Sequence, residues 1–199
     1  MRRLGVLGGS FNPVHWGHLH IALLAAEAAG LDEVLFMPAA RPPHKPDTIL
    51  APAQDRLEML QLALLNEPRA RVSGIELAAD GPRYTVDTLA RLREENPGAE
   101  LAFIVGLDSL REMPTWREPE RILAEHRVIA VDRPGVDREG LAPELSRRVL
   151  LVEGNPFAIS SSRIRRRVAA GLSIRHLLPR PVEEYILARG LYRGDAGRI

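Results

Sequence analysis

Short apolar runs alternate along this chain with longer segments whose apolar residues recur at helical spacing. Runs of about four to eight apolar residues bounded by glycine or proline predict buried strands, whereas a repeat at every third or fourth position predicts an amphipathic helix. The first pattern predicts strands at residues 3–8, 33–38, 71–77, 101–105, 127–131 and 149–152. The second predicts helices at residues 17–29, 52–66, 85–95, 161–170 and 182–188.

This alternation predicts an α/β fold with one Rossmann-like domain, in which a parallel sheet carries helices on both faces. Right-handed crossovers through helices are what join neighbouring parallel strands. Ligands of such sheets bind at the carboxyl ends of the strands. We expect the domain to span residues 1–193, and residues 194–199 to form a C-terminal tail.

Composition narrows the possible functions. A length of 199 residues suits one domain, and 27 basic against 26 acidic side chains leave a formal net charge of +1. We therefore expect neither a nucleic-acid partner nor a membrane partner, and any anion must be bound locally. The absence of cysteine excludes disulfides, thiolate zinc sites and a cysteine nucleophile, and it is consistent with a soluble protein of the cytoplasm. The beginning of the sequence does not resemble a signal peptide.

The strongest chemical signal is the sequence Gly-Gly-Ser-Phe-Asn-Pro-Val-His-Trp-Gly-His at residues 8–18, directly after the first predicted strand. Small residues let a backbone approach a ligand closely, and the start of the following helix presents free N–H groups to phosphate. His15 and His18 are three residues apart, so they project together from the helix start. This pattern predicts a site that stabilises charge on transferring phosphoryl groups.

The residues at 8–18 also allow two interpretations without phosphate. A capped helix that carries two surface histidines is the structural alternative. A zinc site is a weaker one, because no third ligand lies at a characteristic spacing. The segment matches neither the phosphate loop of kinases nor the glycine fingerprint of dinucleotide-dependent dehydrogenases, so these two enzyme classes are disfavoured.

A second signal is Ile159-Ser160-Ser161-Ser162-Arg163-Ile164-Arg165, which predicts an extended approach to a serine-capped helix. The start of such a helix can hold a phosphate tail while Arg165 supplies a planar charged fork. Taken alone, an ordinary capped helix with solvated arginines would explain it more simply. A nucleic-acid patch is disfavoured by the near-neutral charge and by the lack of interleaved aromatic residues.

The histidine pair resembles the motif of the nucleotidylyltransferase superfamily, and further segments make the resemblance more specific. The sequence is similar to bacterial nicotinate-nucleotide adenylyltransferases over roughly residues 3–190, in order and in approximate spacing. Besides the two motifs above, the matching segments are Pro42-Pro43-His44-Lys45, Arg56-Leu57-Glu58-Met59-Leu60, Tyr84-Thr85-Val86-Asp87-Thr88-Leu89, Gly106-Leu107-Asp108 and Trp116.

This resemblance implies transfer of AMP from ATP to nicotinate mononucleotide, with pyrophosphate released and magnesium held through the substrate phosphates rather than by protein ligands. It implies catalytic roles for His15, His18 and Arg165. The ATP-binding residues that it implies are Gly8, Gly9, Ser10, Phe11, His15, His18, Gly106, Asp108, Ile159, Ser160, Ser161 and Arg165.

For the second substrate, the resemblance implies contacts from five residues: His44, Lys45, Tyr84, Thr85 and Trp116. The aromatic face of Trp116 suits a pyridinium cation, although an aromatic residue of the core or a hinge is the alternative. Lys45 is the only lysine among the 27 basic residues, which modestly supports a specific role in binding phosphate.

Several points stay open at the level of the sequence. Where many relatives carry asparagine after the second strand, this chain has Ala39-Ala40, so a side-chain contact to the mononucleotide is either missing or supplied by backbone. Asp108 could also cap the helix after it, and Arg56 is expected to pair with a carboxylate behind the site. Pantetheine-phosphate adenylyltransferase and a non-catalytic nucleotide-binding domain are the alternative functions. A homo-oligomer is possible, and the preference for nicotinate over nicotinamide is undecided.

Overall fold

The computed structural model describes residues 1–40, 50–78, 81, 84–132, 141–154 and 158–194. Its strands are β1 (Arg2–Gly9), β2 (Glu33–Pro38), β3 (Ala70–Val72), β4 (Ala99–Gly106), β5 (Arg127–Val131) and β6 (Val149–Val152). Its α-helices are α1 (Trp16–Ala29), α2 (Ala53–Ala63), α3 (Thr85–Glu95), α4 (Leu107–Glu112), α5 (Pro119–Glu125), α6 (Pro143–Arg148), α7 (Ser161–Ala169) and α8 (Arg180–Arg189). Two 3₁₀ turns, η1 (Ile75–Leu77) and η2 (Met113–Thr115), complete the described elements.

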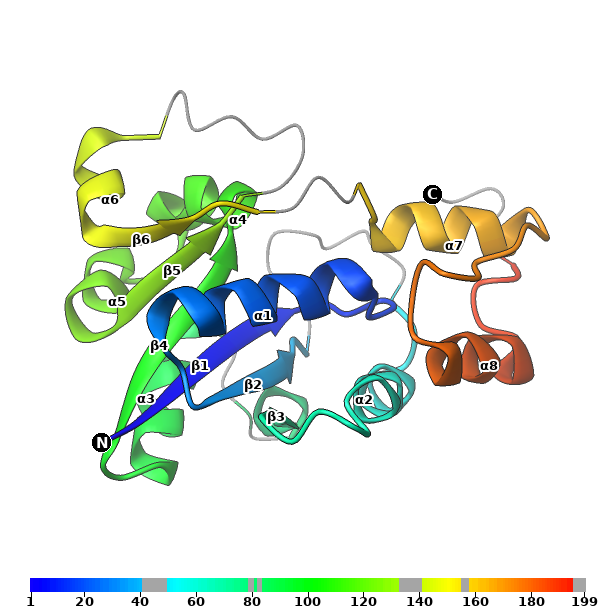
Figure 1. Cartoon of the computed structure of the whole chain (residues 1–199), viewed down its shortest axis with the longest axis horizontal. Coiled ribbons are helices and arrows are strands. Elements are labelled where there is room, and N and C mark those ends of the chain that lie inside the picture. Colours follow the sequence, from blue (N-terminus) through cyan, green and yellow to red (C-terminus); the bar gives the residue numbers. More distant parts are fainter. Residues whose placement is uncertain (41–49, 79–80, 82–83, 133–140, 155–157, 195–199) are drawn as a thin grey trace.

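The six strands form one parallel sheet in the order β3-β2-β1-β4-β5-β6, as Figure 1 shows. This confirms the predicted α/β fold with a parallel sheet. The strand order reverses direction between β1 and β4, and a crevice opens at the carboxyl ends of the strands where such a reversal occurs. The candidate site is therefore expected at the ends of β1 and β4.

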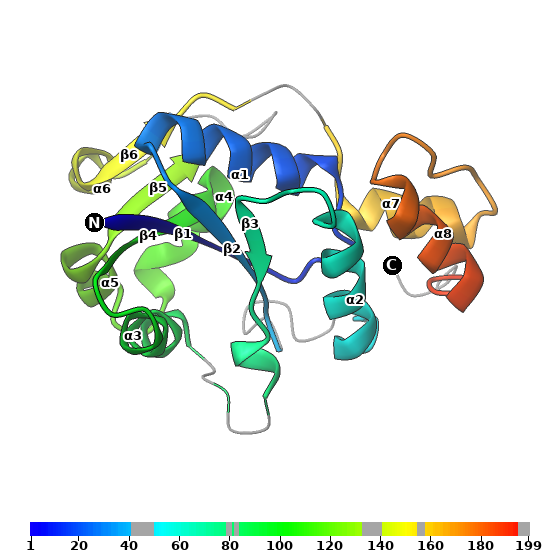
Figure 2. The ribbon, with the colours of Figure 1, turned by 60° about the horizontal axis from the view of Figure 1, so that its bottom comes forward.

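Successive residues of the buried strands point to opposite faces of the sheet and pack in two hydrophobic cores, one on each face. In β1, Leu7 belongs to the core shared with α1, α2, α7 and α8, whereas Val6 belongs to the core shared with α3, α4, α5 and α6. The same alternation separates Ile104 from Phe103 in β4. Figure 2 shows α1 on the opposite side of the sheet from α3 and α5. Strands that are apolar at successive positions are typical of a sheet covered on both faces.

The predicted strand at residues 71–77 is wrong over most of its length. Pairing with β2 ends at Val72, although the backbone N–H of Ser73 still donates to the carbonyl oxygen of Phe36 at 2.9 Å. After Ser73 the chain turns, and the Leu77 N–H donates to the Gly74 carbonyl at 2.9 Å, which closes η1. Apolar residues continue past the end of the strand because Ile75 is buried from a turn.

Three short helices were not among the predicted helical ranges, although a helix was anticipated beside Asp108. These are α4, α5 and α6, which contain 6, 7 and 6 residues. A helix of two turns offers too few repeats of its apolar face to be distinguished from a loop by periodicity. Proline in the first turn of α5 and α6 was the available signal.

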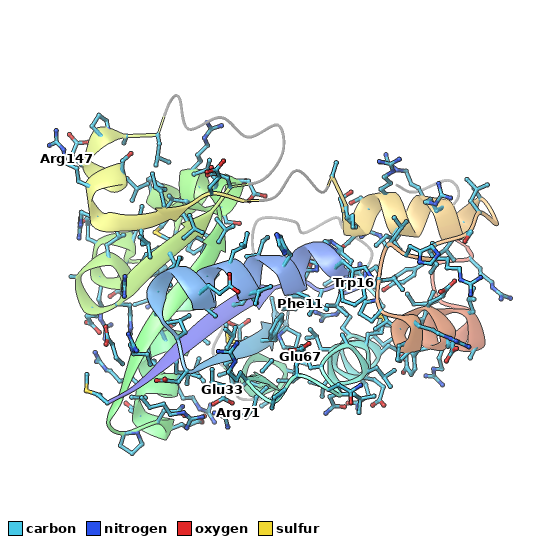
Figure 3. All side chains as sticks on the ribbon, in the orientation of Figure 1. Phe11, Trp16, Glu33, Glu67, Arg71 and Arg147 are labelled. Carbon is cyan, nitrogen blue, oxygen red and sulfur yellow. The ribbon has the colours of Figure 1, made fainter. Side chains whose placement is uncertain are left out.

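Ion pairs join neighbouring strands at the edge of the sheet opposite the candidate site. Glu33, at the start of β2, forms ion pairs with Arg2 and Arg71 from the neighbouring strands. Figure 3 shows Glu33 and Arg71 beside one another, at the opposite end of β2 from Phe11.

No helix in the described part of the chain has the length and apolar character needed to cross a membrane.

Candidate functional site

The carboxyl end of β1 leaves its backbone open at the edge of the sheet. Gly8 is exposed, whereas Phe11 is fully buried. The φ angle of Phe11 is 44°, in the left-handed region that residues other than glycine rarely adopt. A Cβ atom on Gly9 would lie 3.1 Å from Cζ of Phe11, so a larger residue there would press on the Phe11 ring. Strained backbone of this kind is concentrated at ligand sites and persists where the surroundings hold it in place.

The two histidines of the first motif lie against each other at the start of α1. His15 is the N-cap residue, and its ring stacks on that of His18 with centroids 3.8 Å apart. The backbone N–H of His15 donates to Nδ1 of His18 at 3.3 Å. A neutral His18 therefore carries its proton on Nε2 and presents that N–H as a donor. The edge of Phe11 packs against the His18 ring at 5.0 Å between centroids.

The pair is built into the fold rather than placed on the surface. His15 is only 4% exposed, so the alternative of two surface histidines is wrong for this residue. A Cβ atom on Gly17 would lie 3.0 Å from Cε1 and from Nδ1 of His15, which explains glycine between the histidines. The packing leaves the two imidazoles in one orientation, and such preorganised groups stabilise developing charge without reorganising.

The second motif meets the first at this point, although the two bonds that join them span 148 and 153 positions. Ser160 is the N-cap of α7, as predicted, and its Oγ accepts from the Arg163 N–H at 3.3 Å. Ser161 Oγ donates to the Pro13 carbonyl at 2.9 Å. Arg165 is 8% exposed, and its Nη1 donates to the Asn12 carbonyl at 2.9 Å. The guanidinium charge is thus fixed beside the loop that follows β1.

Asn12 is a buried junction that the sequence did not reveal. It is 1% exposed, and its Oδ1 accepts from the Ala51 N–H at 3.0 Å and from the Tyr192 hydroxyl at 2.9 Å. These bonds tie the loop both to the segment before α2 and to the segment after α8. Asparagine beside proline in a loop suggests only a turn, so no sequence signal pointed to this network.

Arg56 corrects one sequence expectation. Within the described part of the chain, its side chain donates to carbonyl oxygens and not to a carboxylate. The side chain is 1% exposed, and burial lowers the pKa of Arg56 from its ordinary value. A guanidinium stays protonated even so. Arg56 therefore adds a buried positive charge directly behind the candidate site.

The end of β4 lies beside the end of β1. Leu7 pairs with Ile104 in the register, which brings Gly9 and Gly106 to the same edge of the sheet. Gly106 is the N-cap of α4, and Asp108 is an exposed residue in the first turn of this helix. The suggestion that Asp108 caps the helix is therefore wrong. Its carboxylate stands at the edge of the sheet, where hydroxyl groups of a ligand could donate to it.

An aromatic group lies on the other face of this edge. Tyr84 is the N-cap of α3, is 42% exposed, and carries the Arg117 guanidinium 4.7 Å above its ring. Thr85 begins α3. Trp116 packs edge-on against Phe103 at 6.1 Å between centroids, and a Cβ atom on Gly8 would be 4.0 Å from that same phenylalanine ring.

The aromatic contacts define the packing of Trp116, and they identify Arg117 as a further residue at this edge. Trp116 is half-buried against the core, so the core alternative describes part of its surface. Arg117 was not predicted, because an arginine next to a tryptophan has no distinctive pattern.

His44 and Lys45 fall outside the described residues. Among the described residues, no three His, Asp or Glu side chains are placed to hold a metal ion.

Comparisons with known proteins agree on one family. Residues 6–167 match the cytidylyltransferase-like family model. The chain is 46% identical to a probable nicotinate-nucleotide adenylyltransferase of Thermomicrobium roseum, over 97% of this chain and 92% of the relative. It is 47% identical to a protein of the same name from Thermus thermophilus, over 96% of this chain and 100% of the relative.

A solved structure shares the fold at much lower sequence identity. Plasmodium falciparum nicotinic acid mononucleotide adenylyltransferase, complexed with NaAD, superposes with a TM-score of 0.79 at 19% identity. The match covers 96% of this chain and 98% of the Plasmodium chain. The arrangement of strands and helices is therefore that of a known enzyme fold.

Proposed function

Because the chain belongs to the nicotinate-nucleotide adenylyltransferase family, we propose that it transfers AMP from ATP to nicotinate mononucleotide and releases pyrophosphate. The product is nicotinate adenine dinucleotide. The observation that carries the proposal is the meeting of the buried His15–His18 pair with Arg165 at the strand ends. Two imidazoles and a guanidinium suit a reaction in which charge grows on phosphoryl oxygens.

The reaction is an in-line displacement at the α-phosphorus of ATP. An oxygen of the mononucleotide phosphate attacks phosphorus, and the bond from phosphorus to the oxygen that bridges to the β-phosphate breaks. Pyrophosphate leaves with the bonding electrons, and no covalent intermediate with the protein is required. The work of the chain is to position the two substrates and to stabilise charge.

On the ATP side, each described residue has a role that its chemistry suits. His18 donates from Nε2 to an α-phosphate oxygen, because its Nδ1 already accepts from the His15 backbone. Arg165 and the amides at the start of α7, with Ile159, Ser160 and Ser161, receive the departing pyrophosphate and the adenine edge. Asp108 accepts from the ribose hydroxyls.

On the acceptor side, the ring of nicotinate mononucleotide lies against Trp116. Its carboxylate meets the start of α3, where Thr85 and free backbone N–H groups attract an anion. Arg117, held over Tyr84, adds positive charge on the same side. His44 and Lys45 are proposed to contact the mononucleotide phosphate.

Magnesium enters this proposal through the substrates. The described residues at the site are imidazole, guanidinium, hydroxyl and amide groups with one carboxylate, Asp108, so the ion would be held by phosphate oxygens. When bound there, it neutralises charge on the polyphosphate. We also propose a cytoplasmic reaction, on the basis of the cysteine-free composition and the small-molecule substrates.

The test is pyrophosphate release from ATP and Mg²⁺ with three acceptors compared side by side: nicotinate mononucleotide, nicotinamide mononucleotide and phosphopantetheine. We expect release with nicotinate mononucleotide, and the ratio of kcat/KM values ranks the two pyridine acceptors. Release only with phosphopantetheine would replace the proposed acceptor. No release with any of the three would leave a nucleotide-binding domain without this activity.

A further inference from the structure

Arg56 occupies an unusual position for a buried cation, because it joins three separate backbone segments. Nη1 donates to the carbonyl oxygens of Ser10 and Ala39, at 2.9 Å and 2.7 Å. Nε donates to the carbonyl of Ala51 at 3.2 Å, and Nη2 makes a longer bond of 3.4 Å to the carbonyl of Ala40. One planar side chain thereby holds the loop after β1, the corner after β2 and the segment before α2.

The corner after β2, formed by Ala39 and Ala40, is also held from other directions. The Ala39 N–H donates to the Gly9 carbonyl at 2.9 Å. The carboxyl group of Glu76, which accepts from the Thr88 hydroxyl at 2.8 Å, faces the backbone of Ala40. The corner has no polar side chain of its own, so these backbone bonds fix its conformation.

The two segments that Arg56 joins lead to opposite sides of the proposed reaction. Residues 8–11 belong to the ATP side, and residues 39–40 lead directly into the segment that carries His44 and Lys45 on the acceptor side. In-line transfer requires the attacking oxygen and the α-phosphorus to be held in a fixed relation, and a misplacement of about 1 Å can cost about 100-fold in rate.

We propose that Arg56 is a positioning residue that locks the loop at residues 8–11 and the corner at residues 39–40 into one unit, so that the two substrate phosphates meet in line. This inference rests on the proposed function. Arg56 touches neither substrate, because its donors are directed to carbonyl oxygens behind the site. Each segment can still bind its own phosphate without Arg56, whereas their relative position cannot be kept.

The decisive variant is Arg56→Lys, which keeps the charge but loses the planar fork that reaches several carbonyls at once. We expect kcat to fall about 10- to 100-fold. The separate dissociation constants for ATP and nicotinate mononucleotide, measured by calorimetry, should stay within about 3-fold, with unchanged binding stoichiometry. In the free protein, hydrogen exchange measured by mass spectrometry should accelerate together in peptides that contain residues 8–11 and 39–40.

Arg189→Lys is the matched control. Arg189 bonds to Asp55 of α2, the residue next to Arg56, but its side chain is 60% exposed and it lies on α8 away from the loop. We expect this variant to keep the wild-type kcat and exchange pattern.

Three results would overturn the proposal. The first is a wild-type kcat in Arg56→Lys, and the second is faster exchange in only one of the two segments. The third is a loss of kcat accompanied by an equal loss of affinity for one of the substrates, which would place Arg56 in binding that substrate. If Arg56→Lys does not fold, Arg56→Gln, which can reach fewer of the carbonyl oxygens, is measured in the same way, and an unchanged kcat in that variant would contradict the proposal.

The exchange experiment also separates this inference from the proposed function. A wild-type chain that forms no pyrophosphate with nicotinate mononucleotide would refute the function. The coupling of the two segments through Arg56 would still be measured by exchange in the free protein, where no substrate is needed.

Discussion

His18 is the residue whose chemistry the structure defines most sharply. Its Nδ1 accepts a backbone N–H and its ring is held between Phe11 and His15, so its orientation and tautomer are both set. Groups that are prearranged in this way stabilise a transition state more than a ground state. A substitution at His18 should therefore affect the rate of the chemical step more than the binding of ATP.

We expect His18→Ala to lower kcat by about 100-fold or more while the KM for ATP changes much less. Steady-state pyrophosphate release measures both constants, and circular dichroism checks the fold. His20→Ala is the control, because His20 lies on the same helix but is not among the proposed ligand contacts. A purified His18→Ala protein with near-normal kcat would remove this residue from the proposed mechanism.

Trp116 carries the second prediction at this scale. Trp116 is half-buried and packs on Phe103, so Trp116→Leu removes an aromatic face while the core stays largely filled. We expect the KM for nicotinate mononucleotide to rise about 10-fold, which corresponds to a lost ring contact of about 1.4 kcal/mol. The KM for ATP serves as the internal control, and a rise of equal size in both constants would argue for a general distortion.

Among the elements, the segment after α8 is tied to the loop after β1. The Tyr192 hydroxyl donates to Asn12 Oδ1, and Tyr192 is itself only 8% exposed. Asn12 also receives the Ala51 N–H, so elements from the beginning, the first third and the end of the chain meet at one side chain. Residues of α7 are proposed to contact a ligand. The segment after α8 supports the candidate site only through Tyr192 and has no proposed ligand contact.

We expect Tyr192→Phe to lower the free energy of unfolding by about 1 kcal/mol, because a buried acceptor loses one of its two donors. Urea denaturation measures this change, and the slope with denaturant should not change. The substitution keeps the ring, so packing is conserved and kcat should stay close to the wild-type value. An unchanged midpoint of denaturation would mean that the bond contributes nothing to stability.

For the molecule as a whole, stability should depend on pH through a group remote from the site. His126 precedes β5 at the amino edge of the sheet and is 9% exposed. Burial lowers the pKa of His126 below its ordinary value of 6.5, and Arg93 and Arg121 lower it further, while Glu125 opposes them. The folded protein therefore binds this proton less readily than the unfolded chain does.

The sign of the effect follows from this difference. The contribution of His126 is fully present above its ordinary pKa of 6.5 and is lost as pH falls through the lower pKa of the folded state. We expect the free energy of unfolding to decrease below about pH 6.5 and His126→Gln to reduce that slope. Denaturation with urea at a series of pH values is the measurement. A slope that is identical in the two proteins would assign the acid sensitivity to other groups.

The pattern of residues along the chain was enough to predict the type of sheet and the two motifs at its edge. Strands such as β2, which is buried at every position, have an apolar pattern that only a sheet covered on both faces explains. The glycines before His15 and the serines before Arg165 mark the starts of α1 and α7 through local backbone chemistry. Local chemistry of this kind is readable because its partners lie within a few residues.

The bonds that join these elements became apparent only in the folded chain. Arg56 was expected to meet a carboxylate, yet it bonds to backbone carbonyls of three segments, and every residue of a chain carries such an oxygen. The bond from Tyr192 to Asn12 spans 180 positions, and that of Arg165 to the Asn12 carbonyl spans 153. The pattern of apolar side chains indicates which face of a helix or strand is buried. The partner of a buried polar group depends on which distant segment the chain brings beside it. Periodicity carries no information about that segment.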